Sequence, residues 1–235
     1  KTLNGGENNL LWMIRQTFNT IELSIKKRLA HNNGYSGQTC WLQSGNSCPA
    51  IEYPTARRIY KMKYNQLGNT GLLVSQLALG TMTFTSGKDS HKIFGSVGQE
   101  EADKMIKKSV ENGINFFDTA DIYAGGESEI ILGKSLHNLG IAREEVVIAS
   151  KAAGRTGMGR NDVGASRGHI MNAMEASLKR LKTDYIDLYQ IHADDFLTPV
   201  DETLGALNDL VTQGKVRYIG VSNWQAWKIA DALGI

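Results

Sequence analysis

Residues 114–123 read INFFDTADIY, an apolar run that stops at Asp118 and is followed five positions later by Tyr123. A short apolar run rich in β-branched and aromatic residues is typical of a buried strand. Three later apolar runs, at 146–150, 186–191 and 216–221, are each followed at once by polar residues. The residues in those places are Lys151, His192, Ser222 and Asn223. Four successive strands are therefore predicted to end in side chains that can take part in chemistry.

Helical patterns separate these strands and complete a repeating strand–helix order. Apolar residues recur at helical spacing over 102–110, 170–181 and 204–211. Ser166 is a suitable N-cap for the second of these segments. With a first strand expected at 74–79, the order predicts a parallel sheet, either doubly wound or closed as a barrel.

The polar residues at the strand ends distinguish these two folds. In a closed barrel the carboxyl ends of all strands meet on one face, where barrel enzymes place their catalytic residues. A doubly wound sheet binds its ligand at one switch point, usually with a glycine fingerprint after the first strand. The first strand here leads into Gly80, Thr81 and Met82, without a G-x-G-x-x-G pattern. The sequence therefore predicts an α/β fold of the (β/α)8 barrel type.

The composition excludes several other classes of protein. The 235 residues carry a net charge of +2, which gives no electrostatic basis for binding nucleic acid or an anionic membrane. No run reaches the roughly 18 apolar residues of a membrane-spanning helix, and two cysteines cannot form a disulfide framework. We therefore expect a soluble, cytoplasmic protein. No metal site is predicted, because the histidines lack metal-ligand spacing. The histidines expected at the surface are His31, His91, His137 and His169.

The ionisable residues at the strand ends suit the reduction of a carbonyl group. A tyrosine hydroxyl, with an ordinary pKa of about 10, is a poor proton donor unless a neighbouring cation stabilises its anion. Lys151 can supply that charge, Asp118 can hold the lysine in place, and His192 can donate a hydrogen bond to the carbonyl oxygen. The hydride must come from a nicotinamide or a flavin, because no side chain supplies one. Ser222 and Asn223 are candidates to hold the nicotinamide carboxamide.

Five spaced motifs in this chain strongly resemble the aldo-keto reductase superfamily. They are MKYNQLGNTGLLVSQLALGTM (62–82), FFDTADIYAGGESE (116–129), VVIASK (146–151), SLKRLKTDYIDLYQIH (177–192) and GKVRYIGVSN (214–223). The first is similar to the start of the family's bacterial branch, which also resembles potassium-channel β subunits and aryl-alcohol dehydrogenases. The resemblance implies a (β/α)8 barrel that reduces an aldehyde or ketone with NADPH, without a Rossmann domain.

The resemblance also implies a role for each site residue. Tyr123 would be the general acid, Lys151 and Asp118 would tune it, and His192 would orient the carbonyl of a small substrate. The cofactor-binding residues implied are Thr81, Met82, Asp118, Ser222 and Asn223.

The same resemblance predicts how the matching region begins and ends. The family's N-terminal hairpin, which closes the bottom of the barrel, corresponds to Lys63–Ser75, turning at GNTG (68–71). Five strand–helix units then fit before Ile235, and the last three units of the family, with further cofactor contacts and the 2′-phosphate site, have no counterpart. Five units leave both edges of the sheet open, so we expect this chain alone to aggregate or oligomerise and to bind NADPH weakly or not at all.

Residues 1–61 match nothing in that family. They hold 8 basic residues, 3 acidic residues and both cysteines of the chain. The predicted organisation is therefore a leader over 1–61, not expected to be a domain, followed by a barrel portion over 62–235. Residues 57–62, RRIYKM, can be encoded by a purine-rich ribosome-binding sequence and a start codon, which favours Met62 as the native start.

Other functions remain open from the sequence. A non-catalytic, cofactor-binding regulatory subunit is one alternative, because the motifs also resemble potassium-channel β subunits. An asparagine takes the place of His192 in those subunits, so the histidine favours the enzyme. A barrel enzyme that forms a Schiff base on Lys151 is the second alternative, and an inactive fragment is the third.

Two glycine-containing segments invite a phosphate-binding interpretation. GRTGMGR (154–160) is predicted to be a mobile loop after the third strand rather than a phosphate cradle. Gly133, Lys134 and Ser135 resemble the end of a P-loop, but Ser128 stands where that motif needs a glycine. The segment is therefore predicted to lie within a helix.

Overall fold

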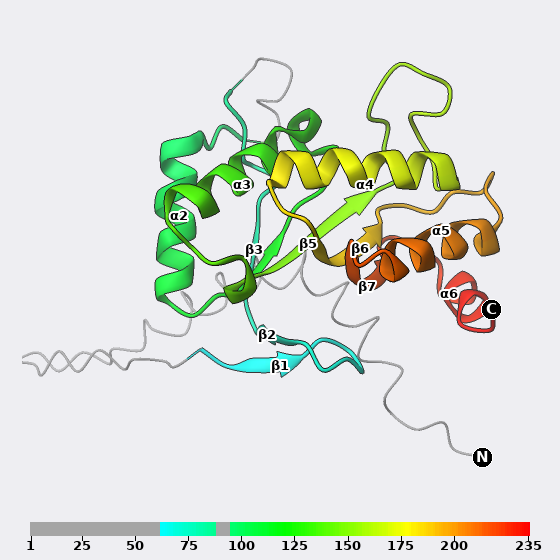
Figure 1. The fold of residues 1–235 in the computed structure, drawn as a ribbon, viewed down its shortest axis with the longest axis horizontal. Coiled ribbons are helices and arrows are strands. Elements are labelled where there is room, and N and C mark those ends of the chain that lie inside the picture. The colour runs from blue at the N-terminus through cyan, green and yellow to red at the C-terminus, as the bar shows by residue number, and fades with distance from the viewer. Residues whose placement is uncertain (1–61, 88–94) are drawn as a thin grey trace, which may run out of the picture. The chain divides into compact units, whose positions relative to one another are not determined.

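The computed structural model describes residues 62–87 and 95–235, whose fold is drawn in Figure 1. The expectations for the leader, for Met62 as the native start and for His31 and His91 lie outside these ranges or depend on what lies outside them. They stay predictions.

A parallel sheet of five strands forms the centre of the described region. Its strands are β3 (Ala78–Gly80), β4 (Phe116–Asp118), β5 (Val147–Ala152), β6 (Ile186–Ile191) and β7 (Val216–Val221). They lie side by side in the order β3-β4-β5-β6-β7, the same order as in the chain. Each strand therefore pairs with the next one along the sequence, as in consecutive units of a barrel.

The helices pack against one another in chain order. They are α2 (Gln99–Glu111), α3 (Glu127–Asn138), α4 (Arg167–Leu181), α5 (Val200–Thr212) and α6 (Ala226–Ala232), with short 3-10 turns η2 (Tyr123–Gly126) and η3 (Arg143–Glu145). α2 contacts α3, α3 contacts α4, α4 contacts α5 and α5 contacts α6. Figure 1 shows them as one layer beside the sheet. A doubly wound sheet would divide its helices between both faces, so this packing agrees with the predicted barrel units.

The hydrophobic core lies between the sheet and this helical layer. Phe117 of β4, Ile148 of β5 and Tyr189 of β6 are completely buried on the sheet side. Ile106 of α2 and Met174 of α4 join them in one core cluster from the helical side. Burying a large side chain of this kind contributes about 1.5–3 kcal/mol. The core therefore holds the strand ends in one fixed arrangement.

The first predicted strand is wrong as a single unit, because the run 74–79 is divided between two sheets. Residues Leu73–Ser75 form β2, which pairs antiparallel with β1 (Tyr64–Gln66) as the expected hairpin. Only Ala78–Gly80 joins the parallel sheet. Between them, the Ser75 hydroxyl donates a hydrogen bond to the carbonyl of Leu77.

The hairpin lies at the amino ends of the parallel strands. Asn115, just before β4, accepts a hydrogen bond from the Ser75 amide and donates one to the Leu73 carbonyl. The Tyr64 hydroxyl donates to the carbonyl of Gly113. The hairpin is therefore at the end of the sheet opposite to the residues singled out above, as predicted.

Three other strands differ in detail from the prediction. β4 begins at Phe116 and includes Asp118, instead of covering 114–117. β5 continues to Ala152, so Lys151 lies inside a strand whose residues are all buried rather than after it. β7 was expected to be a buried strand, but only Val216 is buried and its other residues are half-buried or exposed. It is an outer strand of the sheet in the described part of the chain, which leaves one of its sides without a neighbouring strand.

His169 is a correction to the predicted surface histidines. It lies in the first turn of α4, where Ser166 is the N-cap as predicted. Only 3% of His169 is exposed, and its ring nitrogen Nε2 lies 3.2 Å from the carbonyl oxygen of Gly154. The His169 ring therefore faces the loop after β5 instead of solvent. His137, by contrast, is exposed as predicted.

Replacing Gly133 with alanine is expected to lower the free energy of unfolding by about 1–3 kcal/mol. Gly133 lies within α3, as predicted, and a Cβ there would stand 2.5 Å from the carbonyl oxygen of Leu181 in α4. The two helices would have to separate. Gly205→Ala is a matched control, because that helical glycine has nothing within 4 Å of its added Cβ. Urea unfolding should show a loss for Gly133→Ala and a gain of about 0.5–1 kcal/mol for Gly205→Ala; equal effects would contradict the packing argument.

No helix among residues 62–87 and 95–235 has the length and apolar character needed to cross a membrane.

Candidate active site

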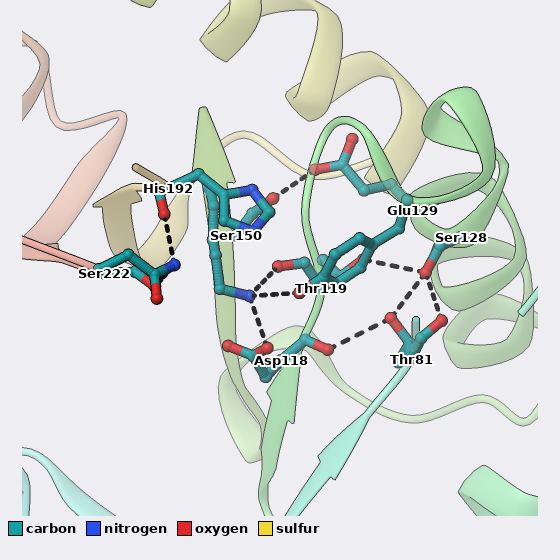
Figure 2. A network of polar contacts seen from close by, with 11 residues as sticks. Thr81, Asp118, Thr119, Ser128, Glu129, Ser150, His192 and Ser222 are labelled. Atoms are coloured by element: carbon teal, nitrogen blue, oxygen red, sulfur yellow. Dashed lines mark hydrogen bonds and ion pairs between the residues drawn. The ribbon is translucent and has the colours of Figure 1, made fainter. Parts of the chain in front are cut away.

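Asp118, Tyr123, Lys151 and His192 meet at the carboxyl ends of β4, β5 and β6. Figure 2 labels Asp118 and His192 of this group. The Lys151 ammonium donates three hydrogen bonds: to Asp118 Oδ1 at 2.6 Å, to the Thr119 carbonyl oxygen at 2.8 Å and to Tyr123 Oη at 3.2 Å. The lysine side chain is 2% exposed, so its charge is compensated by these partners rather than by water. An ammonium has three N–H donors, and all three are in use.

A left-handed turn directs Tyr123 toward the lysine. Ala124, Gly125 and Gly126, which follow the tyrosine, have φ angles of 49°, 65° and 92°. Such angles are strained for alanine and are usually tolerated at positions that the surrounding structure over-determines. Tyr123 is 8% exposed, and its ring contacts the His192 ring edge-on at a centroid distance of 5.6 Å.

The pKa of Tyr123 is shifted by two opposing effects. Burial raises it, as does the charge of Asp118 to a smaller extent, and the charge and hydrogen bond of Lys151 lower it. The net shift is upward, although the lysine alone acts in the predicted downward direction. Tyr123 is therefore protonated at neutral pH and available as a proton donor, while the ammonium beside it stabilises the phenolate that donation would leave.

His192 is neutral at physiological pH. Burial and, second, the charge of Lys151 together lower its pKa to about 4. The histidine backbone is fixed on both sides: its amide donates to the Ala152 carbonyl, and its carbonyl accepts a hydrogen bond from Asn223. A neutral imidazole beside a buried ammonium can donate one hydrogen bond without adding a second positive charge.

The residues expected to hold the cofactor differ in how far they are exposed to solvent. Ser222 is buried and Asn223, with a φ of 58°, is exposed at the end of β7. Met82 is 40% exposed, whereas Thr81 is completely buried. The Thr81 hydroxyl lies 2.7 Å from Ser128 Oγ, so it faces the interior of the domain. Whether Thr81 contacts a cofactor stays a prediction.

Several polar residues behind the four were missed by the sequence reasoning. Ser128 and Glu129 are completely buried at the start of α3 and hydrogen-bond to the ends of neighbouring strands. Asp121 is 2% exposed, and burial, followed by the negative charge of Glu129, raises its pKa to about 7. The motif FFDTADIYAGGESE contains all three, but carboxylates and a serine that follow a strand are equally typical of a solvated segment.

The glycine-rich loop after β5 closes on an acidic residue. The Gly159 amide donates to the Asp162 carboxylate at 2.7 Å, and Arg155 donates to the carbonyls of Gly157 and Gly159. A carboxylate thus occupies the place where a phosphate cradle would bind its anion. The interpretation of 154–160 as a loop is the better one.

Comparisons with known proteins agree with the fold and identify a family. The model of the aldo/keto reductase family matches residues 76–234. A probable voltage-gated potassium channel subunit beta from Oryza sativa is 39% identical over 175 residues, covering 74% of this chain and 50% of that protein. Versiconal hemiacetal acetate reductase from Aspergillus parasiticus is 41% identical over 184 residues, covering 71% and 52%.

A solved structure shows the same arrangement of strands and helices. An aldo-keto reductase from Bacillus halodurans, in its holo form, superposes with a TM-score of 0.63 at 34% identity, covering 74% of this chain and 54% of that one. The predicted fold class, an α/β member of the (β/α)8 barrel family, is therefore confirmed for the described units. The chain spans about half the length of the curated relatives it matches.

Proposed function

Because this chain belongs to the aldo/keto reductase family, we propose that it carries the catalytic residues for the reduction of an aldehyde or ketone to an alcohol with NADPH. The observation that supports this most directly is the Lys151 ammonium, held by Asp118 and the Thr119 carbonyl and donating to the Tyr123 hydroxyl. A buried tyrosine beside a fixed cation can lose its proton to a substrate oxygen, because the cation stabilises the resulting phenolate.

Tyr123 is the proposed general acid. As negative charge develops on the substrate oxygen, the tyrosine O–H proton moves to that oxygen and leaves a phenolate beside Lys151. The ammonium, only 2% exposed, interacts with the phenolate in surroundings from which water is excluded, where electrostatic stabilisation is strong. Asp118 keeps the ammonium charged and in place through its 2.6 Å ion pair.

His192 is the proposed orienting residue. Its ring lies edge-on to that of Tyr123, so both side chains can approach a single substrate oxygen. The neutral imidazole donates a hydrogen bond to the carbonyl and lowers the cost of the developing charge. Because the imidazole keeps its own proton in this hydrogen bond, the tyrosine remains the donor of the transferred proton.

NADPH would supply the hydride that no side chain can provide. The residues present fit its nicotinamide end. The Asn223 amide nitrogen donates to the His192 carbonyl and to Ser222 Oγ, which leaves its carbonyl oxygen to accept from a carboxamide NH2 group. Ser222 adds a hydroxyl at the same strand end. Ser222 and Asn223 would therefore hold the carboxamide, next to the proposed proton donor.

A cofactor-binding regulatory subunit is the alternative, because two of the relatives are probable voltage-gated potassium channel β subunits, each 39% identical to this chain. It would use the same nicotinamide site. The two functions differ in whether bound NADPH is oxidised by an added carbonyl compound.

The test is made on the purified product of the complete gene. NADPH and NADH binding are measured by nicotinamide fluorescence, and turnover of a generic aldehyde is followed as loss of NADPH absorbance. Binding with turnover supports the reductase. Binding without turnover of any of a panel of aldehydes and ketones supports the regulatory subunit, and a protein that binds neither nucleotide contradicts both. Borohydride trapping of a carbonyl compound on Lys151 would instead support the Schiff-base enzyme.

Native stability is expected to fall as the pH is lowered from about 6.5 toward 4, in part through His192. Burial and then Lys151 lower the pKa of His192 from 6.5 to about 4 in the folded protein. Between these values the unfolded chain binds a proton here that the native protein does not, so acid favours unfolding. Above pH 6.5 the histidine is neutral in both the folded and the unfolded chain, so this loss of stability is absent there. Urea unfolding at about pH 4.5 and 7.5 should show a smaller loss in His192→Gln than in the wild type; equal losses would contradict the assignment.

A further inference from the structure

Two consecutive buried residues, Ser128 and Glu129, connect three strand ends behind the proposed active site (Figure 2). Both lie in the first turn of α3, and both are completely buried. Their side chains diverge: the serine reaches β3 and β4, while the glutamate reaches β5. A short polar side chain and a carboxylate buried without solvent need defined partners, and both have them.

The Ser128 hydroxyl joins the ends of β3 and β4. It donates to the Thr81 carbonyl oxygen at 2.7 Å, and it also lies 2.7 Å from Thr81 Oγ1 and 3.1 Å from Thr119 Oγ1. Thr81 in turn donates its amide hydrogen to the carbonyl oxygen of Asp118. Thr119 supplies the backbone carbonyl that accepts one of the three hydrogen bonds of Lys151. Ser128 therefore contacts Thr119, whose carbonyl is a lysine acceptor, and Thr81, whose amide is bonded to Asp118.

The Glu129 carboxylate joins β5 to α4. Its Oε1 atom accepts a 2.5 Å hydrogen bond from the hydroxyl of Ser150, the residue just before Lys151. Its Oε2 atom accepts one from Arg180 at 2.6 Å, and this ion pair compensates the buried charge. Ser150 faces the helical layer, where it bonds to Glu129 of α3. Because side chains alternate along a strand, Lys151 faces the opposite side.

The turn that carries Tyr123 packs against Arg180 of the same ion pair. A Cβ on Gly126, the last residue of that turn, would stand 2.8 Å from Cδ of Arg180. The arginine thus packs directly against the turn while it pairs with Glu129. The backbone segments that position Asp118, Tyr123 and Lys151 all contact the network of Ser128, Glu129 and Arg180.

We propose that Ser128 and Glu129 are positioning residues for the reaction, which fix the Thr119 carbonyl and the β5 backbone so that the Lys151 ammonium stays bonded to Tyr123. They touch neither substrate nor hydride donor and act through Thr119 and Ser150. This assignment rests on the proposed reductase function for its kinetic consequence, but not for its structural one. A displacement of about 1 Å in a reacting group can lower a rate by about a hundredfold, so small shifts here have large effects.

The test compares Ser128→Ala with Ser135→Ala in the full-length protein. Ser135 is a matched control, because it is also a completely buried serine of α3 but bonds to Gln99 instead of a strand end. The structural readout is the side-chain NMR signal of Lys151 in protein labelled with 15N-lysine. A buried ammonium with three hydrogen bonds should exchange its protons slowly. We expect Ser128→Ala to lose this slow signal and Ser135→Ala to keep it.

The kinetic readout is the division of the effect between kcat and KM. Ser128→Ala should lower kcat about ten- to hundredfold with little change in KM for the carbonyl substrate, because the displaced group is the acid and not the binding surface. If Ser128→Ala does not fold, Thr119→Val replaces it in the test. This variant is nearly isosteric, removes the threonine hydroxyl that bonds to Ser128, and should also weaken the slow Lys151 signal and lower kcat. Glu129→Gln should have the same two effects, because it weakens the bond to Ser150 in β5.

The outcomes separate this proposal from the function on which it rests. A wild-type protein without turnover overturns the reductase, while the NMR comparison still decides the positioning role. If Ser128→Ala and Thr119→Val lower stability but retain the slow Lys151 signal and the wild-type kcat, the two residues are only structural and the proposal is wrong.

Discussion

Tyr123→Phe is expected to lower kcat for carbonyl reduction by about 10²–10⁴-fold while leaving NADPH affinity nearly unchanged. The tyrosine hydroxyl receives a 3.2 Å hydrogen bond from Lys151 and is the proposed proton donor. Phenylalanine keeps the ring and its edge-on contact with His192, so the turn and the packing are preserved. Steady-state kinetics and a fluorescence titration with NADPH measure the two quantities separately.

A second variant, at His192, tests the role of the histidine beside the tyrosine. His192→Gln keeps a hydrogen-bond donor near the substrate oxygen, so its kcat should fall less than that of Tyr123→Phe. A Tyr123→Phe protein with near wild-type turnover would contradict the assignment of the general acid. A variant that loses NADPH affinity in parallel with kcat would place the tyrosine in binding rather than in proton transfer.

Lys151→Met is expected to lower both activity and stability. The lysine is 2% exposed and pairs with Asp118, whose side chain is 18% exposed. Removing one partner of a buried pair leaves the other charge uncompensated and costs up to about 3–5 kcal/mol. Activity falls because the phenolate of Tyr123 loses its stabilising cation. The pKa of Tyr123 should also rise further, since Lys151 lowers it in the wild type.

A double variant distinguishes these two effects. Lys151→Met with Asp118→Asn removes both charges, so it should recover part of the unfolding free energy that the single variant loses, measured in urea. It should not recover kcat, because no cation remains beside Tyr123. Recovery of both would mean that the lysine has only a structural role, and recovery of neither would mean that charge compensation is not the cause of the instability.

The fold was largely predictable because its pattern is local. The strands at 186–191 and 216–221 coincide with β6 and β7, and Ser166 caps α4 as expected. These features depend on apolar spacing and capping residues within one segment. The division of 74–79 into β2 and β3 was not predictable in this way, because it depends on hydrogen bonds between Ser75 and Asn115, forty positions apart.

The sequence by itself determined which residues could form the site. Asp118, Lys151, His192 and Ser222 follow or end apolar runs, and parallel strands bring their carboxyl ends to the same edge. That rule needs only the strand order, and the order is the same in the structure as in the chain. The grouping of Asp118, Lys151 and His192 was therefore predictable from the sequence, with Tyr123 five positions after Asp118.

The tertiary structure alone decided how that group is supported. Glu129 meets Ser150 and Arg180, which are 21 and 51 positions away, and Ser128 meets Thr81, 47 positions away. Polar residues in the first turn of a helix are ordinarily solvated, so no spacing rule marks Ser128 and Glu129 as buried. They became partners because the packing of α3 and α4 on the sheet removed water from around them, and a buried polar group must then bond to whatever the fold has brought within reach.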